Sequence, residues 1–360
     1  MASNSASSFQ PGRREAMRRM ALAGLGIACA GGIGTLWARA AHQGAFSSRT
    51  QTGGFGQVDH QLGWTKGVQF GGAFMAEEQG FLKRERIEAH YAAGGPGTDY
   101  RTIVASGRAL VSESNPPGMI EAAVQGQPII AFAAVFQRDP GCIISSADKP
   151  IRSLEEMIGK TIGLPNNIRS QITALMRRAK IDPDRVTFVP VGSDASMLAA
   201  GQIDGYFNWA TTAVPALTIS GFRTHTLHMS DIGAPGYGEL LIARKDRLER
   251  DFELFVRYTR ALIGGWGWMA EHPRETARIV VDKYADPGRD IREQTLQAEV
   301  MRDYILAGDA QTEGLLWVDP AVFEANIRLA REAGALPAGV KITPDDIVTQ
   351  DVIRAALGKS

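Results

Sequence analysis

The stretch Gln61-Leu-Gly-Trp-Thr-Lys-Gly-Val-Gln-Phe-Gly-Gly-Ala-Phe-Met-Ala-Glu-Glu-Gln-Gly-Phe81 predicts a strand that ends abruptly and leads into a short helix. From Val58 to Trp64, larger residues alternate with polar residues and glycine, a period of two that is typical of a strand with one buried face. Lys66-Gly67 ends the strand, and Gly80 is the expected end of the helix. In open α/β sheets, ligands bind just beyond the carboxyl ends of the strands. Trp64 is therefore a candidate binding residue as well as a candidate packing residue.

The first forty residues have the features of a bacterial export signal. Arg13-Arg14 and Arg18-Arg19 precede an apolar run from Met20 to Leu36, and Ala38-Arg39-Ala40 offers a small-residue cleavage site. The run is about 17 residues long, whereas a membrane span needs roughly 20. The second arginine pair favours the twin-arginine export route, although an alanine follows where an aromatic residue is usual. We expect cleavage near Ala40 and a periplasmic mature protein.

The two cysteines have different expected fates. Cys29 lies inside the export signal, but Gly26-Ile27-Ala28 fits a lipoprotein box poorly, so we do not expect lipidation. Cys142 is then the one cysteine of the mature chain, which therefore forms no internal disulfide. We interpret Cys142 as a small buried apolar residue and not as a nucleophile.

Size and charge limit the class of protein. The chain has 39 basic and 39 acidic residues, and it has no basic helix that would indicate a nucleic-acid partner. Beyond the export signal (1–40) and a Gly/Ser/Gln-rich linker (41–57), about 300 residues remain, which is too many for one core and suits two lobes. We expect small molecules and other proteins as partners.

Strand-like and helix-like segments alternate from Val58 to Ala243, a pattern typical of mostly parallel sheets covered by helices. We interpret residues 58–144 as the first part of one lobe and 145–236 as a second, inserted lobe. Residues 237–360 supply a return strand and C-terminal helices to the first lobe. The two crossings are expected near Ser145 to Lys149 and near Pro235 to Glu239, with a ligand cleft between the lobes. A single large enzyme domain would give the same alternation.

Several segments resemble, in order and spacing, the SsuA/THI5-like periplasmic solute-binding proteins of ABC importers. They are Trp64 to Phe81, Val104-Ala-Ser-Gly-Arg-Ala-Leu-Val111, Ile151-Arg-Ser-Leu-Glu-Glu-Met-Ile-Gly-Lys-Thr-Ile-Gly163, Gly201-Gln-Ile-Asp-Gly-Tyr-Phe-Asn-Trp209 and Gly236-Tyr-Gly-Glu-Leu-Leu-Ile242. The resemblance covers about Val58 to Arg260. It implies an α/β, two-lobed periplasmic-binding-protein fold of type II, in which each lobe is a mixed sheet covered by helices and a helical C-terminal segment follows. It also implies an ABC permease in the inner membrane as partner. Members bind thiamine-precursor pyrimidines, flavin-like rings, alkylsulfonates, taurine or nitrate.

The side chains expected at the strand ends, and so in the cleft, are mainly aromatic residues and amides. The candidate ligand-binding residues are Trp64, Gln69, Gly97, Ser114, Asn115, Asn167, Arg169, Asn208, Trp209, Tyr237 and Glu239. An aromatic pair adds only about 0.5 to 1.5 kcal/mol beyond burial, whereas micromolar binding needs about 8 kcal/mol. Hydrogen bonds and lobe closure must supply the rest. The set favours a heteroaromatic ligand such as a thiamine-pathway pyrimidine, with Trp64 and Trp209 on opposite faces of the ring.

Three other ligand and site interpretations stay open. A sulfonate, taurine or nitrate would use helix N-terminal amides and an arginine, and Arg169 stands at a predicted helix start. Arg169 would equally suit a ring that carries a phosphate or carboxylate. Glu239 would pair with a ligand amine or bind its own backbone.

Catalysis is the less favoured alternative. The family also includes a eukaryotic pyrimidine synthase, but the cysteine-rich iron-binding motif of that enzyme is absent from this sequence. His225 and His228 point to opposite faces of a predicted strand, which is poor geometry for a metal. No nucleophile elbow or dinucleotide fingerprint occurs. We expect no catalytic residue, no metal and no cofactor, and a monomer; a ligand-sensing subunit of a receptor would use the same binding module.

Overall fold

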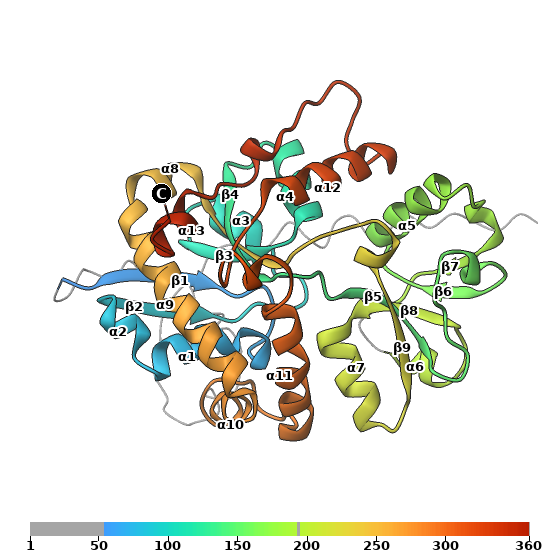
Figure 1. Cartoon of the computed structure of the whole chain (residues 1–360), viewed down its shortest axis with the longest axis horizontal. Coiled ribbons are helices and arrows are strands. Elements are labelled where there is room, and N and C mark those ends of the chain that lie inside the picture. Colours follow the sequence, from blue (N-terminus) through green and yellow to red (C-terminus); the bar gives the residue numbers. More distant parts are fainter. Residues whose placement is uncertain (1–53, 193–194, 360) are drawn as a thin grey trace, which may run out of the picture. The chain divides into compact units, whose positions relative to one another are not determined.

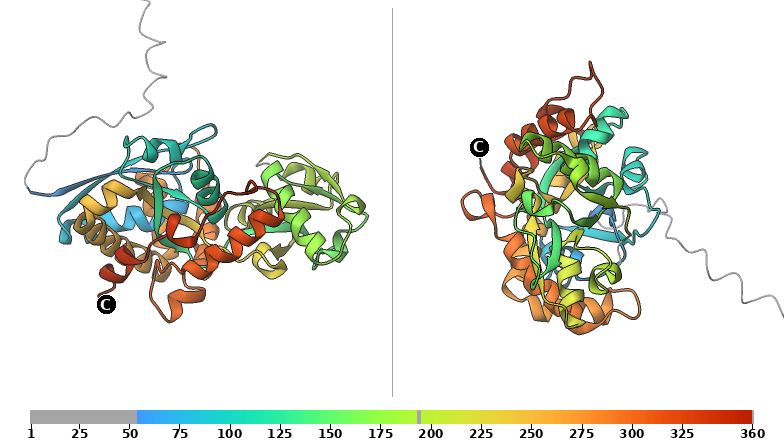
Figure 2. Two further views of the ribbon diagram at one scale, coloured as in Figure 1. Left: turned by 90° about the horizontal axis from the view of Figure 1, so that it is seen from above. Right: turned by 90° about the vertical axis from the view of Figure 1, so that its right-hand side faces the viewer.

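The computed structural model describes residues 54–192 and 195–359 (Figure 1). The predicted export signal and Cys29 lie outside these residues, as does nearly all of the predicted linker. The described chain forms two five-stranded sheets, each in its own lobe (Figure 2). These two lobes confirm the predicted two-lobed α/β fold.

The first lobe is built on a sheet with the strand order β2-β1-β3-β10-β4. Its strands are β1 (Gly56–Gln61), β2 (Ile87–Ala92), β3 (Val111–Ser114), β4 (Ile129–Phe136) and β10 (Gly238–Arg244). The strand β10 runs antiparallel to both of its neighbours, whereas β1 is parallel to β2 and β3. The chain therefore leaves this sheet after β4 and returns to its middle about 100 residues later, as the predicted inserted lobe requires.

The second lobe has the matching strand order β7-β6-β8-β5-β9. Its strands are β5 (Gly141–Ser146), β6 (Thr161–Gly163), β7 (Thr187–Val189), β8 (Gly205–Trp209) and β9 (Thr224–His228). The strand β5 takes the place that β10 has in the first lobe, because it is antiparallel to both neighbours.

The first crossing lies earlier than the sequence predicts. Because β5 already belongs to the second sheet, the chain crosses at residues 137–140 and not near Ser145 to Lys149. Pro140 separates the two strands, and Cys142 to Ile144 are fully buried in the new sheet. Because Cys142 to Ile144 are as apolar as β4, their composition does not show which of the two sheets they join. The return crossing lies between β9 and β10, close to its predicted place.

Helices cover both sheets. The first lobe carries α1 (Gly71–Glu78), α2 (Phe81–Arg84), α3 (Tyr100–Ala105) and α4 (Pro116–Val124), and the second carries α5 (Asn166–Arg178), α6 (Ser196–Ala199) and α7 (Ala210–Ile219). The C-terminal part adds α8 (Lys245–Arg250), α9 (Phe252–Glu271), α10 (Pro273–Lys283), α11 (Ile291–Ile305), α12 (Pro320–Glu332) and α13 (Asp351–Ala356).

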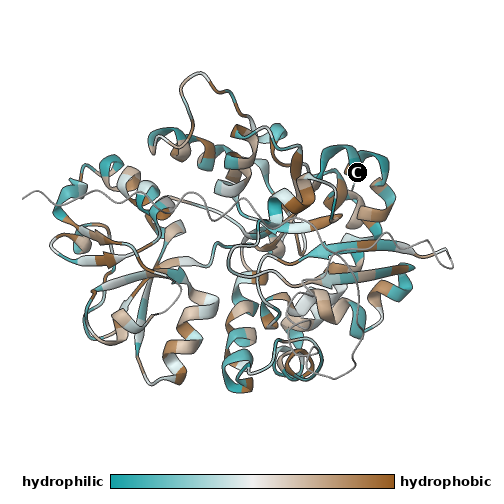
Figure 3. Cartoon of the chain, turned by 180° about the vertical axis from the view of Figure 1, so that it is seen from behind, coloured by the Kyte–Doolittle hydropathy of each residue, from teal (hydrophilic) through white to brown (hydrophobic). Residues whose placement is uncertain are grey.

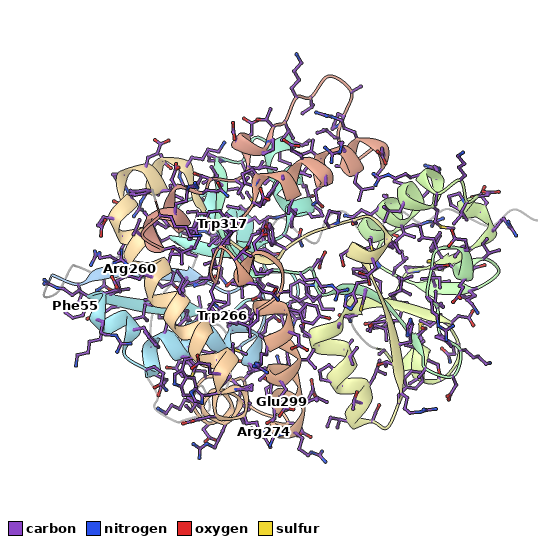
Figure 4. All side chains as sticks on the ribbon, viewed as in Figure 1. Phe55, Arg260, Trp266, Arg274, Glu299 and Trp317 are labelled. Atoms are coloured by element: carbon purple, nitrogen blue, oxygen red, sulfur yellow. The ribbon has the colours of Figure 1, made fainter. Side chains whose placement is uncertain are left out.

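The helices α1 and α9 pack closely because glycines face each other. A Cβ atom on Gly265 would overlap the backbone of α1, and one on Gly72 would overlap the ring of Trp266, a residue that Figure 4 labels. Trp266 is almost fully buried. This contact fixes α1, and with it the loop that precedes α1, against the C-terminal helices.

The C-terminal helices touch both lobes. The helix α11 packs against α7, and α12 packs against both α4 and α5, with an ion pair of 2.6 Å between Arg178 and Glu332. Figure 3 shows hydrophilic and hydrophobic residues on the same helices, as expected for helices that cover a sheet. Within residues 54–192 and 195–359, none of the helices is long and apolar enough to cross a membrane.

Candidate functional site

A cavity of about 870 Å³ is lined by residues of both lobes and of the C-terminal helices. Its first-lobe wall comprises Gly63, Trp64, Thr65, Gly67, Gln69, Phe70, Gly95, Gly97, Thr98, Tyr100, Glu113, Ser114, Asn115 and Glu239. Its second-lobe wall comprises Ala195, Ser196, Ala199, Asn208, Trp209, Thr212, Ala213, Ala216, Leu217 and Ser220. A third wall consists of Arg289, Glu293, Gln294 and Gln297. The size is suited to a small organic ligand.

The loop after β1 carries Trp64 into this cavity. The ring of Trp64 is 40% exposed, one of the largest exposures of a big apolar side chain in the described chain. The loop is held at both ends, since Gly63 N donates to Glu113 Oε2 at 2.6 Å and Val68 N donates to Gln294 Oε1 at 2.8 Å. Gly94 packs against the same loop, where a Cβ atom would overlap the Leu62 carbonyl. Trp64 therefore stands on a fixed loop without being part of the core.

A buried network fixes Glu113 at the end of β3. His60 Nε2 lies 2.7 Å from Glu113 Oε1, and His60 Nδ1 lies 2.7 Å from the Tyr258 hydroxyl. His60 is 1% exposed and Glu113 5% exposed. Both carboxyl oxygens of Glu113 thus have a partner before any ligand binds, and the side chain is held in one orientation at the cavity wall.

Glu239, on β10, is the second buried carboxyl of this wall. Its backbone has a φ of 54°, a left-handed conformation that is uncommon for a residue other than glycine. Gln69 Nε2 donates to Glu239 Oε1, whereas Glu239 Oε2 is buried without a partner among the described residues. Burial, together with the nearby charge of Glu113, raises the pKa of Glu239 well above its ordinary value of 4.5. A buried carboxyl with a free oxygen in a cavity is a hydrogen-bonding site for a ligand.

The second-lobe wall is less polar than the first-lobe wall. The helix α7 lines it with alanines and Leu217, and Trp209 packs its ring edge-on against Phe136 at 6.1 Å between centroids. Asn208 uses its amide internally, because Nδ2 donates to the Tyr206 hydroxyl and Oδ1 accepts from Trp209 N. This wall offers apolar area more than free hydrogen-bonding groups.

The sequence predictions missed the C-terminal wall. Gln294 and Gln297 are buried and joined by a hydrogen bond of 3.2 Å between Nε2 of the first and Oε1 of the second. Gln294 Oε1 accepts the hydrogen bond from Val68 N, which lies 226 residues earlier in the chain. Two glutamines three residues apart on a helix face are a weak sign of a buried polar contact, and only the fold brings that face to the cavity.

Of the predicted ligand-binding residues, eight line the cavity and three do not. The eight are Trp64, Gln69, Gly97, Ser114, Asn115, Asn208, Trp209 and Glu239. Arg169 lies over the ring of Phe188, with its guanidinium carbon 5.6 Å from the ring centroid, and is exposed away from the cavity. Tyr237 is buried, and its hydroxyl is engaged with Asp309 at 2.9 Å and with Asp319 N at 3.0 Å. Asn167 lies in α5, and no residue of α5 lines the cavity; the side chain of Asn167 is not among those that the structure describes.

Other reactive side chains lie apart from the cavity. Cys142 is buried, which raises the pKa of its thiol, as its predicted packing role requires. In the described part of the chain, no three His, Cys, Asp or Glu side chains come together as a metal site would need.

Comparison with known proteins places this geometry in a family. The model of the family described as NMT1/THI5 like matches residues 68–276. The formylaminopyrimidine-binding protein of Halalkalibacterium halodurans is 23% identical over 229 residues, covering 62% of this chain and 69% of the relative. The riboflavin-binding protein RibY of Chloroflexus aurantiacus is 22% identical over 314 residues, covering 79% of this chain and 83% of the relative.

Solved structures show the same fold. The periplasmic aliphatic sulphonate-binding protein SsuA of Escherichia coli superposes with a TM-score of 0.61 at 11% identity, covering 79% of this chain and 95% of SsuA. The desulfurization enzyme DSZB superposes with a TM-score of 0.56 at 14% identity, covering 84% of this chain and 99% of the enzyme. At such identities the likeness concerns the fold alone. The family match, in contrast, covers more than half of the sequence and confirms the resemblance noted from its motifs: the chain belongs to the NMT1/THI5-like family of solute-binding proteins.

Proposed function

We propose that this protein is the solute-binding component of an ABC importer and that it captures a small heteroaromatic ligand in the cavity between its lobes. The observation that carries the proposal is Glu239, whose buried Oε2 has no partner among the described residues and which lines the cavity. A ring with an amine or a ring nitrogen gives that carboxyl the hydrogen bond it lacks. The names of the two relatives, which bind a formylaminopyrimidine and riboflavin, support a ring compound of this kind.

The same wall disfavours an anion at its buried end. Glu113 and Glu239 are both buried there, and burial together with the charge of Glu113 raises the pKa of Glu239. A sulfonate or nitrate placed there would meet the negative charge of Glu113 in a poorly solvated site. A ring edge that donates hydrogen bonds meets the acceptors that it needs.

Two tryptophans supply the faces of the site. Trp64 and Trp209 come from opposite lobes and line the same cavity. Stacking contributes about 0.5 to 1.5 kcal/mol per aromatic pair beyond area burial. The ring contacts therefore add to the hydrogen bonds at Glu239 and do not replace them.

Export and transport complete the proposal. The first forty residues act as the export signal, cleavage follows near Ala40, and the mature protein delivers its ligand to a permease in the inner membrane. Gln69, Ser114 and Asn115 share the first-lobe wall with Glu239 and contact the ligand. No chemistry is done on the ligand in this role, in keeping with the binding function that the names of both relatives state.

Calorimetry and thermal shift on the purified mature protein test the proposal. We expect a formylaminopyrimidine or riboflavin to raise the unfolding midpoint, and taurine and nitrate to leave it unchanged. Glu239→Gln should weaken ring binding about 10- to 100-fold, the loss expected for a hydrogen bond to a charged or strongly polar group. Arg169→Gln, outside the cavity, is the matched control and should bind as the wild type does. A clear shift with taurine or nitrate and none with any ring compound would contradict the proposal.

A further inference from the structure

Arg289 is a cation at the cavity wall with few partners among residues 54–192 and 195–359. It lies in the turn between α10 and α11, is half-buried, and lines the cavity. Among the described residues, its guanidinium donates one hydrogen bond, from Nη2 to the Thr65 hydroxyl. A guanidinium carries five N–H donors in a planar fork, so most of its donors remain open.

The acidic residues beside Arg289 do not neutralise it. Asp290 caps α11 and forms an ion pair of 2.7 Å with Arg292. Glu293 lines the cavity one turn further on, yet it forms no ion pair with Arg289 within 4.0 Å in the part of the chain that the structure describes. The guanidinium is therefore not paired with a carboxylate among the described residues.

Arg289 and Glu239 act on different parts of the same loop. Glu239 is bound by Gln69, whereas Arg289 binds Thr65 and packs against Gly67, 3.8 Å from where a Cβ atom would stand. No ion pair joins Arg289 to Glu239 among the described residues, and the charge that acts on Glu239 is that of Glu113. The cavity thus has an acceptor region for N–H groups and a separate region for an anion.

The volume leaves room for both regions to be used at once. Cavities of roughly 300 to 1,000 Å³ hold drug-sized ligands, and this one, at about 870 Å³, is near the upper end of that range. One six-membered ring fills a small part of it. A ring with an extended substituent matches the volume better.

We propose that Arg289 forms an anion-binding subsite, so that the ligand is a heteroaromatic ring carrying a carboxylate or phosphate group. This inference rests on the proposed ring-binding function and adds the class of substituent. The sequence offered Arg169 as the arginine for an anionic group, but Arg169 lies over Phe188. In the fold, Arg289 is the arginine that lines the cavity. A planar guanidinium binds carboxylate and phosphate oxygens in pairs, which gives orientation as well as affinity.

A structural role for Arg289 makes a different prediction. If the guanidinium only ties the Trp64 loop to α11 through Thr65, its loss would weaken every ligand equally. If it binds an anion, its loss would weaken only the charged member of a matched pair. Thr65→Val removes the tie but keeps the charge, and it separates the two roles.

The test uses two matched pairs in calorimetry: riboflavin with its phosphate monoester, and an aminopyrimidine alcohol with its phosphate monoester. In the wild type, at least one monoester should bind about 10- to 100-fold more tightly than its neutral partner, the gain expected from charge-assisted hydrogen bonds. Arg289→Gln should abolish this preference, and Arg289→Lys should keep part of it. Thr65→Val and the control Arg292→Gln should retain it.

Each contrary result has its own meaning. Equal binding of both members of each pair to the wild type, or an equal loss for both in Arg289→Gln, overturns the anion subsite and leaves ring binding intact. If the folded protein binds no member of either pair, the ring-binding function fails and the subsite with it.

Discussion

The two lobe walls of the cavity differ in how they are built. The first-lobe wall contains two buried carboxyls, Glu113 and Glu239, one fully bonded to the protein and one with a free oxygen. The second-lobe wall combines four alanines and Leu217 with Trp209 and three hydroxyl side chains, and its one amide, Asn208, is bonded internally. We infer that the first lobe selects the ligand through fixed polar groups and that the second lobe closes over it with apolar area. Binding proteins of this kind tighten as lobes close, so selection can precede closure.

The largest change in the free energy of unfolding is expected from a substitution in the network that supports the first-lobe wall. His60→Ala removes the partner of a buried carboxyl, and breaking a buried pair in this way costs about 3 to 5 kcal/mol. Urea unfolding monitored by tryptophan fluorescence should show that loss. The exposed His90, on the neighbouring strand β2, is the control, and His90→Ala should change the free energy of unfolding by less than about 0.5 kcal/mol. Equal, small losses for both variants would show that the network does not hold Glu113.

The next effect is a pH dependence that belongs to the first lobe. Burial, with the charge of Glu113, raises the pKa of Glu239, so the folded protein keeps a proton that the unfolded chain releases above about pH 4.5. The stability linked to Glu239 is therefore greatest below that pH and falls as the pH rises toward the folded-state pKa. The slope is at most about 1.4 kcal/mol per pH unit.

Comparison with Glu239→Gln between pH 6.5 and 8.5 isolates Glu239 from the other titrating groups, because both proteins share those groups. Burial raises the pKa of Asp139 to about 6 and lowers that of His228 from 6.5 to about 4, so both still titrate at the lower end of this range, but equally in the two proteins. Wild-type protein should lose stability across this range in urea unfolding, and Glu239→Gln should lose less. Parallel slopes for the two proteins would mean that Glu239 is ionised in the folded state.

The smallest effect compares the two tryptophans. Trp209 packs edge-on against Phe136, so Trp209→Ala should cost about 1 to 3 kcal/mol of stability in addition to ligand affinity. Trp64 is 40% exposed on its loop, so Trp64→Ala should change stability by less than about 0.5 kcal/mol and still weaken ring binding. Thermal unfolding and calorimetry on both variants separate the two quantities. A loss of fold in Trp64→Ala would place that ring in the core.

The fold followed from local patterns to a large extent. The alternation of strand-like and helix-like segments from Val58 to Ala243 predicted an α/β fold, because these signals act between neighbours in the chain. The first crossing was misplaced because Cys142 to Ile144 are as apolar as the strands on either side. The apolar pattern indicates that a strand is buried, but it does not indicate in which sheet.

The candidate site followed from sequence only where its residues stand at strand ends. Trp64, Asn115, Trp209 and Glu239 do so, and the structure brings them to one cavity. Arg169 and Tyr237 occupy similar places in the sequence but are engaged elsewhere, one over Phe188 and one between two aspartates. A position after a strand brings a residue to the correct edge of the sheet, but the rotamer and the neighbours decide where its side chain goes.

The sequence by itself determined the class of fold, the two-lobed plan and the aromatic character of the candidate site. Tertiary structure alone decided the electrostatics of that site, because every contact that sets it joins distant residues. His60 meets Tyr258, Gln69 meets Glu239, and Val68 meets Gln294, at separations of 198, 170 and 226 residues. Secondary structure depends on short-range periodicity, which the sequence displays directly. Charge, burial and free hydrogen-bonding capacity depend on which distant groups the fold brings together, and so Arg289 and the C-terminal wall became visible only in the folded chain.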